Sequence, residues 1–291
     1  MVPNSEGATA LQISEEVQDK RKIPRIEIYD PRLRRDCEEG RSDKQPILDQ
    51  VGERVALWSG KVFGPFPRLK SKLLVLDLNG LLVDVVYPKP KDVEADRCIH
   101  GRAIFRRPFY LEFLQFCLQN FEIGIWSSRN RLLIEKILEY LMGDLKNRLL
   151  FVWDSSYCSI TRSKCLDNKH KNVVFKDLRK LWMKHDPQLP WEDGYFNESN
   201  TLLIDDSPYK ALLNPPCTAI FPNEFKFTSQ EENSLGIDGD IRIYLQKLAD
   251  AKDVRKFVEE NPFGKQPITE NNEHWSFYQG AIESLYVPSV L

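Results

Sequence analysis

The chain has 291 residues, of which 42% are hydrophobic and 29% are charged, and its formal net charge is -2. Such a chain lacks the positive field that gathers nucleic acid, so we expect no direct nucleic-acid ligand. No stretch reaches the length of a membrane span, and we expect no membrane association. The six cysteines form no CxxC pair, which is typical of a reducing compartment and predicts an intracellular location, in the nucleus or the cytoplasm.

Composition divides the chain into three parts. Residues 1–69 are charged, show weak hydrophobic periodicity and indicate a poorly ordered N-terminal arm without a signal or transit peptide. Residues 70–263 contain the periodic apolar segments and are expected to form the globular domain. Residues 264–291 are expected to be a C-terminal tail.

Apolar runs that fit buried strands alternate with amphipathic segments that fit helices. In chain order, strands are expected at 73–76, 121–126, 149–153, 201–205 and 217–221. Helices are expected at 108–118, 129–142, 176–185 and 240–259. The polar segment 155–172 is expected to be an irregular insertion.

This alternation predicts a three-layer, Rossmann-like α/β fold, with a parallel sheet, helices on both of its faces and no large cap. In such sheets, ligands bind at the carboxyl ends of the strands. Asp77 follows the first expected strand, Ser127 follows the second, and Asp205 and Asp206 end the strand that starts at Thr201. The sequence therefore predicts a polar site at this edge of the sheet.

The chemistry-bearing groups come in the order acid, hydroxyl, lysine and acid pair, at Asp77, Ser127, Lys176 and Asp205-Asp206. Two adjacent carboxylates after a buried strand repel one another unless a cation lies beside them. Mg²⁺ prefers oxygen ligands, and a lysine stabilises the oxygens of a phosphoryl group. The set therefore indicates a Mg²⁺-dependent phosphate site.

Five segments carry a resemblance to a known family. They are KLLVLDLNGLL (72–82), RRPF (106–109), IWSSRN (125–130), VVFKDLRKLW (173–182) and TLLIDDSPYKALLNPP (201–216). In this order they resemble the haloacid-dehalogenase (HAD) superfamily. Within it they resemble the phosphatases that act on the RNA polymerase II C-terminal domain, including a branch with a ubiquitin-like module. Residues 1–69 do not resemble that module. The resemblance covers 72–263 and implies the HAD fold and a protein-phosphatase function.

The resemblance also implies a role for each residue of the site. Asp77 would be the nucleophile that forms an aspartyl-phosphate. The side chains of Asp77 and Asp206 and the backbone carbonyl of Asn79 would bind Mg²⁺, while Asp205 would orient the water around the metal.

Lys176 and Ser127 would contact the phosphoryl oxygens, the first through its charge and the second through a hydrogen bond. The residues alone leave simpler roles open. Ser127 could cap the following helix, with Ser128 as the competing hydroxyl. Lys176 could be a surface lysine, and an aspartate that ends a strand, as Asp77 does, is often a turn residue.

One position departs from the family. A second aspartate normally follows the nucleophile by two residues, where it protonates the leaving group and activates water, and this chain has Asn79 there. An amide cannot exchange that proton, and general acid–base assistance contributes about 10²- to 10⁴-fold. The readings are a slow phosphatase, a pseudophosphatase that binds Mg²⁺ and a phosphorylated partner, and a scaffold. An import-receptor role, known on this fold, is discounted because no presequence or anchor is seen.

The expected partner is a phosphoprotein or phosphopeptide, because an uncapped site admits a protein substrate. Segments 84–106 and 155–172 are expected to determine which substrate binds. Trp153 and Tyr157 are candidates for stacking on a peptide proline, with core packing as the alternative. No pattern in the sequence specifies an oligomeric state.

Overall fold

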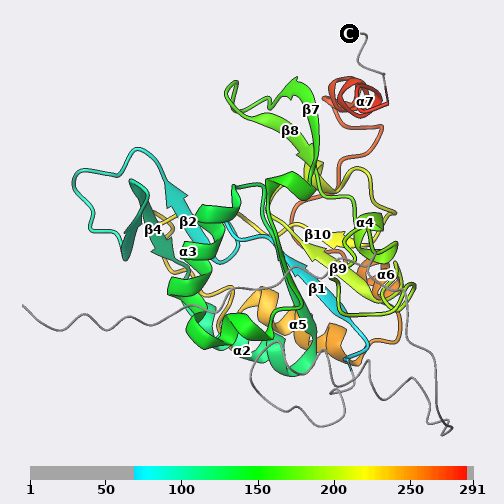
Figure 1. The fold of residues 1–291 in the computed structure, drawn as a ribbon, viewed down its shortest axis with the longest axis horizontal. Coiled ribbons are helices and arrows are strands. Elements are labelled where there is room, and N and C mark those ends of the chain that lie inside the picture. Colours follow the sequence, from blue (N-terminus) through cyan, green and yellow to red (C-terminus); the bar gives the residue numbers. More distant parts are fainter. Residues whose placement is uncertain (1–68, 287–291) are drawn as a thin grey trace, which may run out of the picture. The chain divides into compact units, whose positions relative to one another are not determined.

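The structure, a computed structural model, describes residues 69–286 (Figure 1). The expected N-terminal arm therefore lies outside the described residues, apart from Leu69. No helix between residues 69 and 286 is both long and apolar enough to cross a lipid bilayer. The cysteines of this part of the chain are free thiols.

A five-stranded parallel sheet forms the centre of the fold, in the order β10-β9-β1-β5-β6. Its strands are β1 (Leu73–Leu76), β5 (Glu122–Trp126), β6 (Phe151–Trp153), β9 (Thr201–Ile204) and β10 (Ala219–Ile220). The central strand β1 pairs in register on both sides, with Leu73 opposite Glu122 on β5 and Thr201 on β9. All five expected strands are present, so the predicted parallel sheet is confirmed.

Side chains of β1 alternate between two apolar cores, as the two faces of a strand require. Leu74 and Leu76 belong to a core that contains residues of α2 (Tyr110–Asn120), α3 (Arg131–Met142), α5 (Asp240–Asp250) and α6 (Val254–Glu260). Leu73 and Val75 belong to the core on the other face, with residues of α4 (Arg179–Trp182). Helices therefore cover both faces, as the three-layer prediction states (Figure 1).

Two small antiparallel sheets are inserted into this framework. One sheet has the strand order β2 (Val83–Val86), β4 (Arg102–Arg106) and β3 (Arg97–Ile99), and these strands lie between β1 and α2 in the sequence. Strands β7 (Ser159–Lys164) and β8 (Asn172–Phe175) form a hairpin. The expectation of an irregular segment at 155–172 is therefore wrong. Its polar residues still form a strand because the hairpin is exposed on one side and alternates buried and exposed positions, with Thr161 donating a hydrogen bond to the carbonyl of Val173.

Two expected helices and the expected C-terminal tail differ from the structure. The helix expected at 240–259 is two helices, α5 and α6, and the Asp253 side chain caps α6 by accepting from the backbone N–H of Lys256. Only Arg179–Trp182 of the segment 176–185 is α-helical. The expected C-terminal tail contains α7 (Trp275–Glu283), whose Ala281 is buried in a small core beside Val173 and Phe175 of β8.

Candidate active site

The carboxyl ends of β1 and β9 bring three acids together. Asp77 follows β1 directly, and its backbone N–H donates to the carbonyl of Ile204 on β9. Asp205 and Asp206 follow Ile204, so the pairing of the two strands determines where all three carboxylates lie. Oxygens of Asp77, Asp205 and Asp206 lie within 4.8 Å of one another, and this is the one such acid cluster among residues 69–286.

Lys176, which follows β8, reaches this cluster from the other side. Its ammonium nitrogen lies 3.2 Å from Asp77 Oδ1 and donates to Asp205 Oδ2 at 2.5 Å. The Lys176 side chain has no solvent exposure, so it is not the surface lysine that the sequence also allowed. The backbone N–H of Leu78 also donates to Asp77 Oδ1, at 2.8 Å. These contacts hold the Asp77 carboxylate in one orientation.

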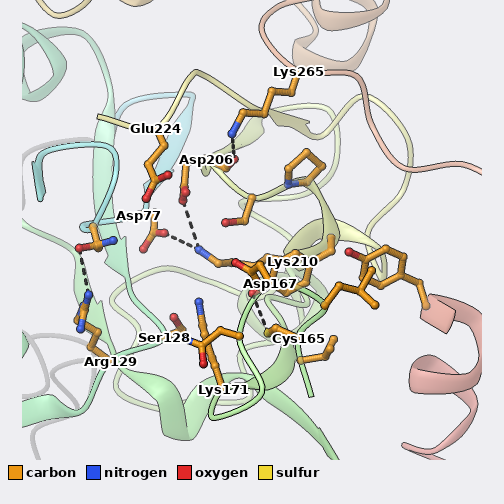
Figure 2. Close-up of a pocket in the computed structure, with 18 of the residues that line it drawn as sticks. Asp77, Ser128, Arg129, Cys165, Asp167, Lys171, Asp206, Lys210, Glu224 and Lys265 are labelled. Atoms are coloured by element: carbon orange, nitrogen blue, oxygen red, sulfur yellow. Dashed lines mark hydrogen bonds and ion pairs between the residues drawn. The ribbon is translucent and has the colours of Figure 1, made fainter. Parts of the chain in front are cut away.

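A second lysine, Lys210, enters the same cluster and had no role in the sequence analysis. Its Nζ atom lies 2.7 Å from Asp77 Oδ2, 2.7 Å from Asp205 Oδ1 and 3.5 Å from Asp206 Oδ1, and Figure 2 shows its contacts with Asp77 and Asp206. The side chain comes from the 3₁₀ turn Pro208–Ala211 and is buried. The available signal was its spacing, because Lys210 stands four residues after Asp206, where side chains on one turn can meet.

The two ammonium groups separate the proton affinities of the adjacent acids. Burial by itself would raise the pKa of Asp205, but Lys176 and Lys210 outweigh burial and hold that pKa well below its usual range. Burial raises the pKa of Asp206 to about 7, with repulsion from Asp205 and Asp77 adding to the effect and Lys210 opposing it. Asp206 is therefore the member of the cluster whose negative charge is least compensated.

Asn79 lies at the edge of this cluster, and its amide is engaged. The Oδ1 atom accepts from the backbone N–H of Val85 at 2.9 Å and from Arg129 Nη2 at 3.1 Å. Gly80, the next residue, has φ of +82°, which glycine adopts without strain. A Cβ atom there would lie 2.9 Å from Asp206 and 3.1 Å from the side chain of Glu224. The turn at Gly80 therefore brings Glu224 beside the acid cluster, a second residue that sequence reasoning missed.

The two candidate hydroxyls occupy different places. Ser127 is buried, and its Oγ atom accepts from the backbone N–H of Arg129 at 3.4 Å. Ser128 lines the cavity that also contains Asp77. Which of these two hydroxyls contacts a phosphate remains a prediction. Trp153 is buried and stacks on Tyr157 with ring centroids 4.3 Å apart, an arrangement that matches the core-packing alternative.

A cavity of about 800 Å³ opens over the acids (Figure 2). Its acidic and basic lining residues are Asp77, Arg102, Arg129, Asp167, Lys171, Asp206, Lys210, Glu224, Lys265 and His274. Residues of the inserted sheet, of the hairpin and of the segment before α7 therefore surround one opening. A cavity of this size, with cations around a buried carboxylate, can admit a phosphorylated side chain.

The donor set fits Mg²⁺ in its chemistry, because it consists of clustered carboxylate oxygens. Lys210 holds two of the same oxygens, one on Asp77 and one on Asp205. A divalent cation that takes Oδ2 of Asp77 as a ligand would therefore compete with that ammonium group.

Fold and acid cluster together define an α/β phosphatase-type domain. The chain matches the family model of NLI interacting factor-like phosphatases over residues 72–255, which is more than half of its 291 residues. It therefore belongs to that family, whose domain is of the HAD type, as the sequence motifs indicated.

Curated relatives carry related names. The chain is 24% identical over 243 residues to "Ubiquitin-like domain-containing CTD phosphatase 1" of Xenopus tropicalis, covering 81% of this chain and 64% of the relative. It is 29% identical to the protein of the same name from Drosophila melanogaster, covering 58% of this chain and 46% of that relative. An uncharacterized FCP1 homology domain-containing protein of Schizosaccharomyces pombe is 24% identical, covering 66% of this chain and 77% of that relative. The chain thus spans less than two thirds of the length of these CTD phosphatase relatives.

Among solved structures, the chain is similar to a fission yeast RNA polymerase II CTD phosphatase, Fcp1, bound to beryllium fluoride. The sequences are 15% identical, 74% of this chain and 62% of that chain are covered, and the TM-score is 0.36. A second structure of Fcp1 gives a TM-score of 0.35. Scores this low carry no argument about the activity of the chain.

Proposed function

We propose that this protein is a phosphoprotein phosphatase of the HAD type, which holds a phosphorylated serine or threonine against Asp77 and hydrolyses the phosphate slowly with the help of Mg²⁺. The observation that carries the proposal is the position of Asp77. Its carboxylate is almost completely buried between the ammonium groups of Lys176 and Lys210, yet it lines the open cavity. Positive charge around a fixed carboxylate permits the approach of a phosphate dianion, which a bare acid cluster would repel.

Asp77 is the proposed nucleophile. One of its carboxylate oxygens would form a bond to phosphorus while the bond from phosphorus to the serine or threonine oxygen breaks, and water would then hydrolyse the aspartyl-phosphate. Lys176, which Asp205 holds beside Asp77, would neutralise charge on the phosphoryl oxygens. Asp77, Asp206 and the backbone carbonyl of Asn79 are the proposed ligands of Mg²⁺, which supplies positive charge to the phosphoryl oxygens when bound.

Slow turnover follows from the residue at position 79. The leaving oxygen needs a proton, and the amide of Asn79 cannot give one up and take it back. Glu224 is a carboxylic acid in the cavity outside the proposed metal ligands, and it lies beside Asp206 and Asp77 (Figure 2). Glu224 is therefore the proposed substitute acid and base.

A second candidate function is a pseudophosphatase that binds a phosphorylated partner without hydrolysis. The engaged amide of Asn79 favours it, because both hydrogen bonds at Oδ1 fix that side chain away from proton transfer. The names of the CTD phosphatase relatives support a phosphorylated protein as the partner in either case. The nuclear or cytoplasmic location inferred from the cysteines remains a prediction.

Hydrolysis of a chromogenic aryl phosphate, with and without Mg²⁺, tests the proposal on the wild type, Asp77→Asn and Asp167→Asn. Asp167 lines the same cavity but is exposed and outside the acid cluster, so it is the matched control. We expect slow, Mg²⁺-dependent turnover by the wild type and by Asp167→Asn, and none by Asp77→Asn. A silent wild type that still binds inorganic phosphate would be a pseudophosphatase. A wild type that neither hydrolyses the ester nor binds phosphate would overturn the phosphate site itself.

A further inference from the structure

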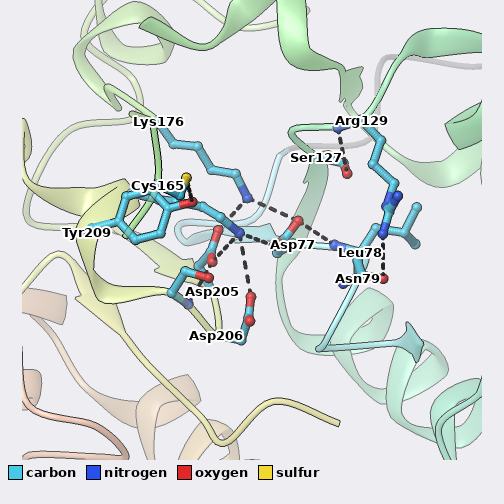
Figure 3. Close-up of polar contacts among 12 residues, drawn as sticks. Asp77, Leu78, Asn79, Ser127, Arg129, Cys165, Lys176, Asp205, Asp206 and Tyr209 are labelled. Atoms are coloured by element: carbon cyan, nitrogen blue, oxygen red, sulfur yellow. Dashed lines mark hydrogen bonds and ion pairs between the residues drawn. The ribbon is translucent and has the colours of Figure 1, made fainter. Parts of the chain in front are cut away.

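Arg129 is held in the cavity by three contacts to neutral groups. It is the residue after Ser128, in the turn between β5 and α3, and its Nη2 atom donates to Asn79 Oδ1 at 3.1 Å and to the carbonyl of Val85 at 3.3 Å (Figure 3). Its backbone N–H donates to Ser127 Oγ. Asn79 and Val85 therefore position the guanidinium group, and Ser127 positions the backbone of Arg129.

No carboxylate in residues 69–286 forms an ion pair with Arg129, although the side chain is half-buried. Burial lowers the pKa of Arg129 and the charge of Arg102 adds to that shift, while the charges of Asp77 and Asp84 oppose it without an ion pair to the guanidinium group. A half-buried cation with only neutral hydrogen-bond partners is poorly compensated, and an anion beside it restores the balance. Arg129 lines the same cavity as Asp77, so the anion that fits is the one bound at Asp77.

Because the amide of Asn79 is neutral, it does not compensate the charge of Arg129, which can still attract a bound anion. Replacing that amide by a carboxylate at the same place would put an anion about 3 Å from the guanidinium nitrogen. The two groups would form an ion pair, and the new carboxylate would then compensate the charge of Arg129 in place of a bound phosphate. Such a carboxyl group would be a poor proton donor.

We propose that Asn79 and Arg129 are one functional unit, in which the amide orients the guanidinium group as a ligand for the oxygens of a phosphate monoester bound at Asp77. This inference rests on the phosphate site proposed above. Asn79 stands where the family has its proton-transferring aspartate, and here it positions Arg129 instead. The cavity is therefore suited to hold a phosphate. Asn79 and Arg129 therefore depend on each other. An acid in place of Asn79 would pair with Arg129, and loss of Arg129 would remove the cation that Asn79 positions.

Phosphate binding is the first test. Isothermal titration with inorganic phosphate would compare the wild type, Arg129→Gln, Arg129→Lys and Arg102→Gln. Arg102 lines the same cavity and carries the same charge, but it contacts the carbonyl of His100 and not Asn79, so it is the matched control. We expect Arg129→Gln to weaken binding about 10- to 100-fold, the range of a hydrogen bond to a charged group. Arg102→Gln should have a clearly smaller effect, and Arg129→Lys, which keeps the charge, should fall between them.

Turnover is the second test and does not depend on the first. It compares Asn79→Asp with the double variant Asn79→Asp/Arg129→Gln on an aryl phosphate, across pH 5 to 9. We expect the kcat of the double variant at saturating substrate to exceed that of the single variant by about 10-fold or more, because removing the guanidinium group frees the introduced carboxyl group to carry the proton. Its KM should be higher, because Arg129 no longer contacts the phosphate. Each sample needs a mass check for deamidation at Asn79, since glycine follows it.

The outcomes separate this inference from the proposed function. A wild type that does not bind phosphate contradicts the phosphate site, and the inference falls with it. Wild-type binding that Arg129→Gln reduces no more than Arg102→Gln does leaves the phosphate site intact and overturns the role of Arg129. A single Asn79→Asp variant as active as the double variant overturns the pairing of the two positions. Arg129→Lys provides the same comparison if Arg129→Gln does not fold.

Discussion

Lys210 Nζ lies 2.7 Å from Asp77 Oδ2, although 133 residues separate the two in the chain. The ammonium group thus contacts an oxygen of the proposed nucleophile, and a divalent cation that binds the same oxygen would compete with it. Within the acid cluster, one of this protein's own side chains already supplies positive charge at the place where Mg²⁺ is expected.

Replacing Lys210 should increase the response of the protein to Mg²⁺. We expect Lys210→Met to be less stable than the wild type without metal, since breaking a buried ion network costs about 3–5 kcal/mol. Added Mg²⁺ should then raise its Tm by more than it raises that of the wild type, because no ammonium group competes for Asp77. Lys265→Met is the control, as the Lys265 side chain is exposed and its ammonium group donates to the backbone carbonyl of Asp206 and not to an acid of the cluster. Equal Mg²⁺ shifts in all three proteins would contradict the prediction.

Asp206 should make the stability of the metal-free protein depend on pH. Its pKa is raised from 3.8 to about 7 by burial, so the folded state holds the proton more tightly than the unfolded state does. The contribution of Asp206 to the free energy of unfolding is therefore greatest below about pH 4, and it falls as the pH rises from about 4 to about 7. The slope is at most about 1.4 kcal/mol per pH unit. Urea unfolding of the wild type and of Asp206→Asn at several pH values measures it, and parallel curves for the two would refute it.

Glu224 should affect the chemical step if the protein is a working phosphatase. We expect Glu224→Gln to lower kcat for an aryl phosphate by about 100-fold, since general acid–base assistance typically contributes about 10²- to 10⁴-fold. KM should change little, because the amide keeps the size of the side chain. Glu224→Asp retains a carboxyl group and should retain part of the rate. A change confined to KM would instead indicate that Glu224 acts in substrate binding.

Gly124 should be the least replaceable glycine of the central sheet. It lies in β5, where an added Cβ would be 2.1 Å from the ring of Phe151 on the neighbouring strand β6. Overpacking a core typically costs about 1–3 kcal/mol, so Gly124→Ala should lower the free energy of unfolding by that order. Gly280 in α7 has open space around it, and Gly280→Ala should be neutral or stabilising. Urea unfolding of both variants gives the comparison, and similar values for both would contradict it.

Much of the framework was readable from local patterns. The apolar runs before Asp77 and Asp205 predicted buried parallel strands, and the strands are there because continuous apolar segments must be covered on both faces. The hairpin at 159–175 was not readable, since its pairing depends on contact between β7 and β8 across a loop. The division of the 240–259 helix at Asp253 was missed because the capping side chain competes with an otherwise continuous pattern.

The sequence by itself determined that Asp77, Asp205 and Asp206 meet at one edge of the sheet. Parallel strands place their carboxyl ends together, and the position of an acid after an apolar run is a local property. Only the tertiary structure decided that Lys210 lies among those acids and that Arg129 is bonded to Asn79. The direction of a long flexible side chain depends on which partners the rest of the fold brings near it. Lys210 stands four residues after Asp206, which allows their contact, but that spacing does not specify the contacts of Lys210 with Asp77 and Asp205.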